Sequence, residues 1–109
     1  MRGPGYDTES LAGVAAAGAQ LVLFTTGRGN PIGFPTVPVI KVASTTERYR
    51  AMEDDMDVNA GEVLEGKSLA AVGGAIVALV RDVADGRKTK AEINRQDGIV
   101  CLYTRHPAF

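Results

Sequence analysis

Two short apolar runs, separated by a loop rich in glycine and proline, dominate the pattern of hydrophobic and polar positions. The first run, from Gln20 to Phe24, is continuous, as expected for a strand buried on both faces. The second, from Val37 to Val42, is rich in valine and isoleucine. Between them, Pro31 and Pro35 each remove a backbone donor and restrict the preceding residue. The stretch 25–35 is therefore predicted to be a loop at a strand end.

Two helices are predicted on either side of these strands. The first extends from about Thr8 to Ala17, with Asp7 as N-cap and Gly18 just beyond the C-terminus. The second extends from Glu47 to about Glu53, and Ser44, Thr45 and Thr46 are all candidate caps. A helix, a strand, a loop and a second strand thus alternate along the chain.

The longest predicted helix begins at Ser68 as N-cap and ends at Gly86. Its apolar residues are spaced by three and four positions, which predicts a stripe facing the core. Thr89 and Glu92 have the spacing of a capping box, which predicts a last short helix. The stripe comprises Leu69, Val72, Ile76, Leu79, Val80 and Val83.

The last apolar run, from Ile99 to Tyr103, predicts a final strand, in which Cys101 would be a small buried side chain rather than a nucleophile. Helices alternating with apolar strands favour an α/β layered domain with a mainly parallel sheet. At 109 residues, the chain is expected to form a single domain, 1–109.

Composition excludes several classes of function. The 12 basic and 13 acidic residues nearly balance, which gives no electrostatic case for nucleic acid or an anionic membrane as partner. The single Cys101 excludes an internal disulfide and fits a reducing compartment, so a cytoplasmic location is expected. With His106 as the only histidine, no metal site can be built from histidine and cysteine within the chain. No signal peptide or membrane span is expected.

The glycine loop is the first candidate for binding chemistry. Gly27 and Gly29 permit positive φ, so that backbone N–H groups can turn toward an anion, and Arg28 offers a planar fork for a carboxylate or phosphate. The alternative is a tight turn with a solvated arginine. The spacing matches neither a P-loop nor a dinucleotide-binding G-x-G-x-x-G motif.

Acidic residues between the second helix and the long helix provide a second candidate. The run from Glu53 to Asp55 could bind a hard cation, or it could be a solvated helix end. Asp57 and Asn59 would lie on one face of a short extended piece, Met56–Gly61. They would form either a set of hydrogen bonds that anchors a loop or part of a site, and the spacing does not choose between these two interpretations.

Taken together, these segments resemble the C-terminal region of the altronate dehydratase and galactarate dehydratase family. The matching pieces follow the order of that family and cover about residues 3–93. They are Pro4–Asp7, Gly18–Gln20, Phe24–Gly33, Pro38–Val42, Met56–Gly61 and Gly86–Glu92.

The resemblance implies a Rossmann-like fold, with a knotted topology as an open alternative. It also implies a hydro-lyase that removes water from a sugar acid, of the galactarate or altronate type, to give a 2-keto-3-deoxy sugar acid. A similar enzyme instead cleaves sulfite from sulfolactate. Iron(II) or another divalent metal is implied in the full-length enzyme, with ligands outside this segment. Family members are several times longer, so upstream domains of the same polypeptide are expected partners, and the isolated domain is expected to be inactive.

Residues on matched positions are the candidates for holding substrate, while the catalytic residues are left open. Two alternatives for the domain stay open as well: a structural or homo-oligomerisation module, and an anion-binding module without chemistry of its own. The candidate substrate-binding residues are Thr26, Arg28, Asn30 and Lys41, followed by Asp57 and Asn59.

Overall fold

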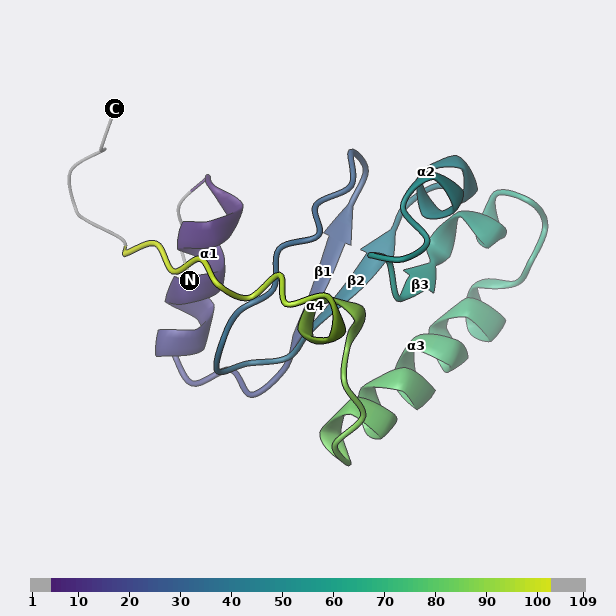
Figure 1. The fold of residues 1–109 in the computed structure, drawn as a ribbon. Helices are drawn as coiled ribbons and strands as arrows, with labels where there is room; N and C mark the ends of the chain where they lie inside the picture. Colours follow the sequence, from purple (N-terminus) through teal and green to yellow (C-terminus); the bar gives the residue numbers. More distant parts are fainter. Residues whose placement is uncertain (1–4, 103–109) are drawn as a thin grey trace.

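A three-stranded parallel sheet lies at the centre of the molecule in the computed structural model, which describes residues 5–102 (Figure 1). The strands are β1 (Val22–Thr26), β2 (Val39–Ala43) and β3 (Val58–Asn59), and they lie in the order β1-β2-β3. Both pairs of neighbours are parallel. The expected α/β class with a mainly parallel sheet is therefore confirmed.

The two long strands differ in burial because of their places in the sheet. All five residues of β2, the middle strand, are buried. In β1, which lies at the edge, exposure alternates along the strand, and the side chain of Leu23 is 48% exposed. The prediction that the first apolar run is buried on both faces is thus wrong, and the strand also begins two residues later than Gln20. β1 pairs with a neighbouring strand on one side only. The apolar character of its residues does not indicate whether a strand lies at the edge or in the middle of a sheet, so the sequence did not reveal this exposure.

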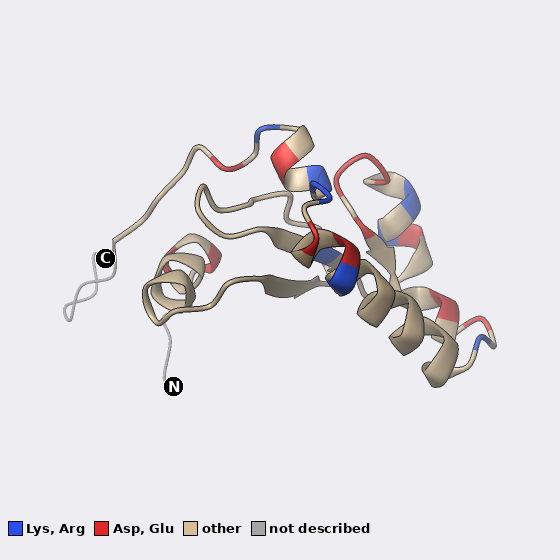
Figure 2. Ribbon diagram, turned by 90° about the horizontal axis from the view of Figure 1, so that it is seen from below, with Lys and Arg blue, Asp and Glu red and all other residues tan. Residues whose placement is uncertain are grey.

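The two faces of the sheet differ in character. On one face, Ile40 and Val42 of β2 form the core with Val83 of α3 (Leu69–Ala84). Successive side chains of a strand alternate between faces, so Lys41 points to the opposite side. Figure 2 shows α4 (Lys90–Ile93) above the sheet and α3 below it. The sheet thus separates an apolar layer from one that contains a buried lysine.

Helix α1 (Asp7–Ala16) departs from the prediction at its N-terminus. The N-cap is Tyr6, whose side chain makes no capping hydrogen bond, so the assignment of Asp7 as N-cap is wrong. The carboxylate of Asp7 instead accepts a hydrogen bond from the side chain of Asn30, far along the chain. At the other end, Gly18 has a φ of +99°, as its predicted position just beyond the helix requires.

The other helix caps follow local sequence closely. Thr45 caps α2 (Thr46–Ala51) by accepting from the N–H of Arg48 at 3.2 Å. Ser68 caps α3, and both hydrogen bonds of the capping box between Thr89 and Glu92 are present in α4. The extended piece before α3 is shorter than predicted, because β3 passes directly into the 3₁₀ turn η1 (Ala60–Val63).

The apolar stripe of α3 is only partly core. Val72 and Val83 are buried, whereas the side chain of Leu69 is 76% exposed. The prediction of Leu69 as a core residue is therefore wrong, because the helical period places it on the stripe but no element within residues 5–102 covers its side chain. Ile76, Leu79 and Val80 are half-buried.

The final predicted strand is absent from the part of it that the structure describes, residues 99–102. A strand needs a neighbouring edge with which to pair, and this segment makes no sheet pairing. Just before it, the carbonyl of Gln96 accepts a hydrogen bond from Gly33 at 2.9 Å. Cys101 is half-buried rather than buried. Tyr103 and His106 lie outside the described residues.

Candidate functional site

The loop that follows β1 borders an open cleft of about 700 Å³. The backbone of the loop turns at Gly29, where φ is +87°, and the N–H of Gly29 donates to Oγ1 of Thr26 at 2.9 Å. Arg28, between the two glycines, is exposed. The volume is within the range of small-molecule sites. The cleft is lined by Asp7, Phe24 and residues 25–32.

Asn30 fixes the wall of this cleft. Its Oδ1 accepts from the N–H of Ile32 at 2.9 Å, and its Nδ2 donates to the carboxylate of Asp7. This second bond links the loop to the first turn of α1. Asp7 was not predicted as part of the site, because its position before a helix indicated a cap.

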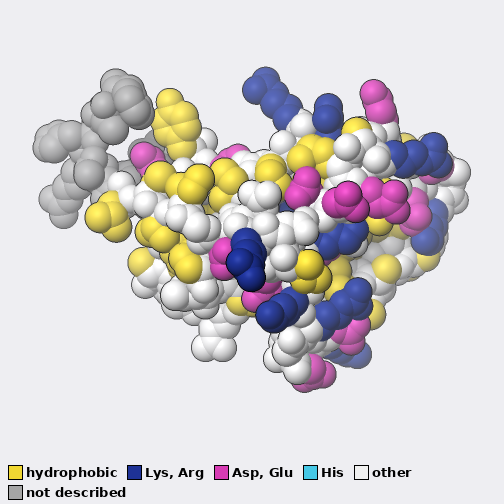
Figure 3. Space-filling model, in the orientation of Figure 1, with side chains coloured by type: hydrophobic (Ala, Val, Ile, Leu, Met, Phe, Trp, Pro, Cys, Tyr) yellow, Lys and Arg dark blue, Asp and Glu magenta, His cyan; other side chains and the backbone are white. Residues whose placement is uncertain are grey.

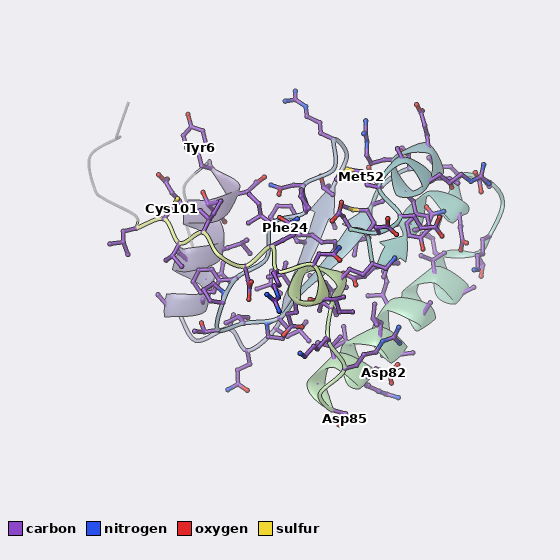
Figure 4. The ribbon with its side chains drawn as sticks, viewed as in Figure 1. Tyr6, Phe24, Met52, Asp82, Asp85 and Cys101 are labelled. Atoms are coloured by element: carbon purple, nitrogen blue, oxygen red, sulfur yellow. The ribbon has the colours of Figure 1, made fainter. Side chains whose placement is uncertain are left out.

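Gly29 also allows α2 to pack closely against the loop. A Cβ at this position would lie 2.9 Å from Cδ of Arg48 and 2.2 Å from Sδ of Met52. Met52 is labelled in Figure 4, near the upper end of the strands. Nε of Arg48 is buried and has no hydrogen-bond partner. Nothing in the local sequence distinguished Arg48 from the other arginines of the chain.

Lys41 is the most unusual residue near the cleft. It is 0% exposed, and its Nζ has no hydrogen-bond partner. Lys41 and Phe24 are partners in the register of β1 and β2, so their side chains share one face, and Nζ lies 3.6 Å from the centroid of the Phe24 ring. Burial lowers the pKa of Lys41 to about 8, although the negative charges of Asp7 and Asp57 oppose this shift.

Asp57 is bound to backbone on both sides. One oxygen of its carboxylate accepts from the N–H of Lys41 at 2.8 Å, and the other accepts from the N–H of Lys90 at 3.0 Å. The side chain of Asn59 bonds Thr46 and accepts from the N–H of Gly61 at 3.0 Å. These are the bonds of a set that anchors loops, the first of the two interpretations that the spacing left open.

The structure places five of the six candidate residues in two separate clefts. Thr26, Arg28 and Asn30 line the large cleft. Asp57 and Asn59 line a smaller cleft of about 310 Å³, together with residues of α2 and α3. Lys41 lines neither cleft, but its side chain lies against Phe24, which belongs to the wall of the first.

Charged side chains of both signs are interspersed on the surface shown in Figure 3.

The run Glu53–Asp55 does not form a set of metal ligands: Oδ1 of Asp55 accepts from Nδ2 of Asn94 at 3.2 Å. Across residues 5–102, no three side chains of the His, Cys, Asp or Glu types come together in a way that could hold a metal ion. None of the helices in this range combines the length and hydropathy that a membrane span requires.

Comparison with known proteins assigns the chain to a family. Residues 1–106 match the family described as D-galactarate/altronate dehydratase, C-terminal. The chain belongs to this family. The match covers the glycine loop, the three strands and all the helices.

Three curated relatives are similar to parts of the chain. The chain is 49% identical over 65 residues to altronate dehydratase of Bacillus subtilis, which covers 60% of the chain and 13% of the relative. It is 43% identical over 74 residues to galactarate dehydratase (L-threo-forming) of Escherichia coli, covering 67% and 14%. It is 37% identical over 79 residues to the beta subunit of (2R)-sulfolactate sulfo-lyase of Chromohalobacter salexigens, covering 72% and 20%. The aligned part of the chain thus spans only a fifth or less of each relative.

Proposed function

We propose that the chain acts as the C-terminal domain of a hydro-lyase that dehydrates a sugar acid to a 2-keto-3-deoxy sugar acid. In such a reaction the proton next to the carboxylate is removed and the β-hydroxyl leaves, so negative charge develops on the carboxylate side. In this proposal the full-length enzyme is cytoplasmic, and its other domains complete the active site. Family membership over residues 1–106 is the observation that carries it.

The glycine-loop cleft is the part of the domain to which we assign substrate binding. Arg28 is exposed at the loop and can form two parallel hydrogen bonds with a carboxylate. Thr26 and Asn30 line the same cleft and can meet sugar hydroxyls, although each already holds one backbone N–H of the loop. The domain would thus orient the acid rather than carry out the proton transfer. Iron(II) or another divalent metal, if the full enzyme uses it, belongs to the other domains in this proposal.

A second candidate substrate is sulfolactate, because the chain also matches a sulfo-lyase subunit over 72% of its length. The sulfonate and carboxylate of sulfolactate are both anions that an arginine fork can bind. The alternative in which the domain only supports oligomerisation predicts no ligand in the cleft at all.

The experiment is a chemical-shift titration of the ¹⁵N-labelled chain with galactarate, altronate and sulfolactate at constant ionic strength. We expect shifts of the amides of residues 25–32 with at least one of the acids. Arg28→Ala should weaken that binding about tenfold or more, whereas Arg50→Ala, an exposed arginine of α2 that does not line the cleft, should leave it unchanged. If no acid shifts the loop amides, the assignment of substrate binding to this cleft fails.

A further inference from the structure

The ammonium of Lys41 is a buried cation without a hydrogen-bond partner. Of the side chains within residues 5–102, only Lys41 and Arg48 have a buried nitrogen in this state. A buried polar group without a partner is costly, and a charged one more so, which is why native structures contain few of them. Such a group therefore needs an explanation. One explanation is that its N–H donors form hydrogen bonds only when a ligand is bound.

The groups around Lys41 leave its three N–H donors free. Phe24 presents the face of its ring, which attracts the cation but accepts no conventional hydrogen bond. The carboxylate of Asp57 is engaged by two backbone N–H groups, and that of Asp7 by the side chain of Asn30. Both carboxylates favour the charged form of Lys41 without bonding to its Nζ. The site thus holds a positive charge close to carboxylates that already have other donors.

Phe24 connects this cation to the cleft. The ring is half-buried and belongs to the lining of the cleft, while Lys41 beneath it is fully buried. The two residues are partners in the parallel register, so the contact is held by the ladder between β1 and β2. Movement of the aromatic side chain away from Nζ would open the cation to the cleft.

We propose that Lys41 is a concealed anion-binding group of the cleft, covered by Phe24 in the free protein and hydrogen-bonded to the carboxylate of a sugar acid in the complex. This inference rests on the proposed function, because it takes the ligand of the cleft to be that acid. Arg28 binds from the exposed side in this arrangement, and Lys41 binds from the side of the sheet. The contact between Phe24 and Lys41 must be broken on binding, and the free energy that this requires lowers the net affinity for the acid.

The chemistry favours a carboxylate over a neutral ligand. A bond between an ammonium and a carboxylate is about twice as strong as one between neutral groups, and it strengthens in a medium of low dielectric constant. A role in packing alone does not require the charge, because a methionine would fill the same space beside Phe24. A packing role therefore does not explain why a charged ammonium, which is costly to bury, occupies this position.

Nuclear magnetic resonance can test the proposal on the chain itself. Galactarate is titrated into protein labelled with ¹⁵N and ¹³C, and the backbone amides of residues 25–32 and the ¹³Cε–¹Hε signal of Lys41 are followed together. The Lys41 signal is assigned from its loss in Lys41→Met. The control is Lys88→Met, which removes the charge of an exposed lysine. Circular dichroism checks that each variant is folded.

We expect the Lys41 signal and the loop amides to shift with the same dissociation constant. Lys41→Met should weaken galactarate binding about tenfold or more, because a charged hydrogen bond is lost, and Lys88→Met should not change it. Phe24→Leu should tighten binding about threefold, because the free protein then no longer holds the cation against a ring.

Three outcomes would overturn all or part of the inference, and they differ in what they say of the proposed function. Shifts of the loop amides with an unmoved Lys41 signal, and equal affinity in Lys41→Met, would leave the proposed function standing without a role for Lys41. An absence of shifts in both places would remove the cleft as a substrate site and Lys41 with it. Looser or unchanged binding in Phe24→Leu would overturn the covering role of the ring.

Discussion

Lys41 and Asp57 are joined by two reciprocal hydrogen bonds. The N–H of Lys41 donates to the carboxylate of Asp57 at 2.8 Å, and the N–H of Asp57 donates to the carbonyl of Lys41 at 2.9 Å. The side chain of Asp57 thus pairs with β2 just before β3 begins. The second oxygen of this carboxylate accepts from the N–H of Lys90 in α4. A single carboxylate, just before β3, is therefore hydrogen-bonded to both β2 and α4.

Loss of this carboxylate should destabilise the domain. Asp57→Ala leaves two backbone N–H groups without their acceptor, one of them on the fully buried Lys41. We expect the free energy of unfolding to fall by about 3 kcal/mol, since hydrogen bonds to a charged group are worth more than neutral ones. Urea unfolding followed by circular dichroism measures the change. Asp54→Ala is the control, because Asp54 is exposed; an equal loss in both variants would show that Asp57 has no special role.

Removal of the charge of Lys41 should stabilise the domain at neutral pH. The folded pKa of about 8 lies below the ordinary lysine value of 10.5, so the folded state binds fewer protons than the unfolded state between these two values. Stability attributable to Lys41 therefore rises with pH across this window, and below pH 8 the full cost of burying the charge is present. Lys41→Met should then exceed the wild type in free energy of unfolding by about 2 to 3 kcal/mol at pH 7.

The difference in stability between Lys41→Met and the wild type should depend on pH. The gain from Lys41→Met should shrink as the pH rises from 8 toward 10.5, because the folded lysine is already neutral in this window and the free energy needed to deprotonate the unfolded lysine falls as the pH approaches its pKa of 10.5. Unfolding of both proteins at pH 7 and pH 10 measures the gap, and the comparison cancels the other groups that titrate in this range. A gap that does not change between these pH values would contradict a lowered pKa.

Substitution of Gly73 should stabilise α3. This glycine lies in the interior of the helix, and a Cβ at its position would meet no atom within 4 Å. Alanine restricts the unfolded chain and suits a helix better, so Gly73→Ala should add about 1 kcal/mol to the free energy of unfolding. Thermal unfolding measures this as a higher Tm. A lower Tm would contradict the open space at this position, because it would mean that the added methyl group collides with neighbouring atoms.

Substitution of Gly61 should have the opposite effect. A Cβ at this position would lie 2.2 Å from the backbone nitrogen of Thr46 and 2.5 Å from the carbonyl carbon of Thr45, and backbone atoms cannot move aside as a flexible side chain can. Gly61→Ala should therefore lower the free energy of unfolding by about 3 kcal/mol, because η1 must shift away from α2. Urea unfolding measures the loss, and Gly73→Ala is a matched glycine control. Full stability of Gly61→Ala would contradict the close packing.

Features that depend on a few neighbouring residues were predictable from the sequence. Ser68 and Thr89 cap their helices because a hydroxyl three residues before a free N–H needs no other element. The order of helices and strands up to α4 followed from hydrophobic periodicity, although the strand predicted after it is absent from residues 99–102, and the glycine loop followed from its prolines and glycines. The resemblance to the dehydratase family likewise rests on motifs that can be read along the chain.

Only the tertiary structure decided which residues meet across the chain. Asp7 looked like a cap but bonds Asn30, because the loop after β1 returns to the first turn of α1. Leu69 lies on an apolar stripe yet is exposed, because a helical period does not say where the neighbouring layer ends. The register of β1 and β2 placed Phe24 over Lys41, and burial then lowered the pKa of Lys41. The sequence thus determined the local elements, whereas the cleft and its buried cation arise from contacts between residues far apart along the chain.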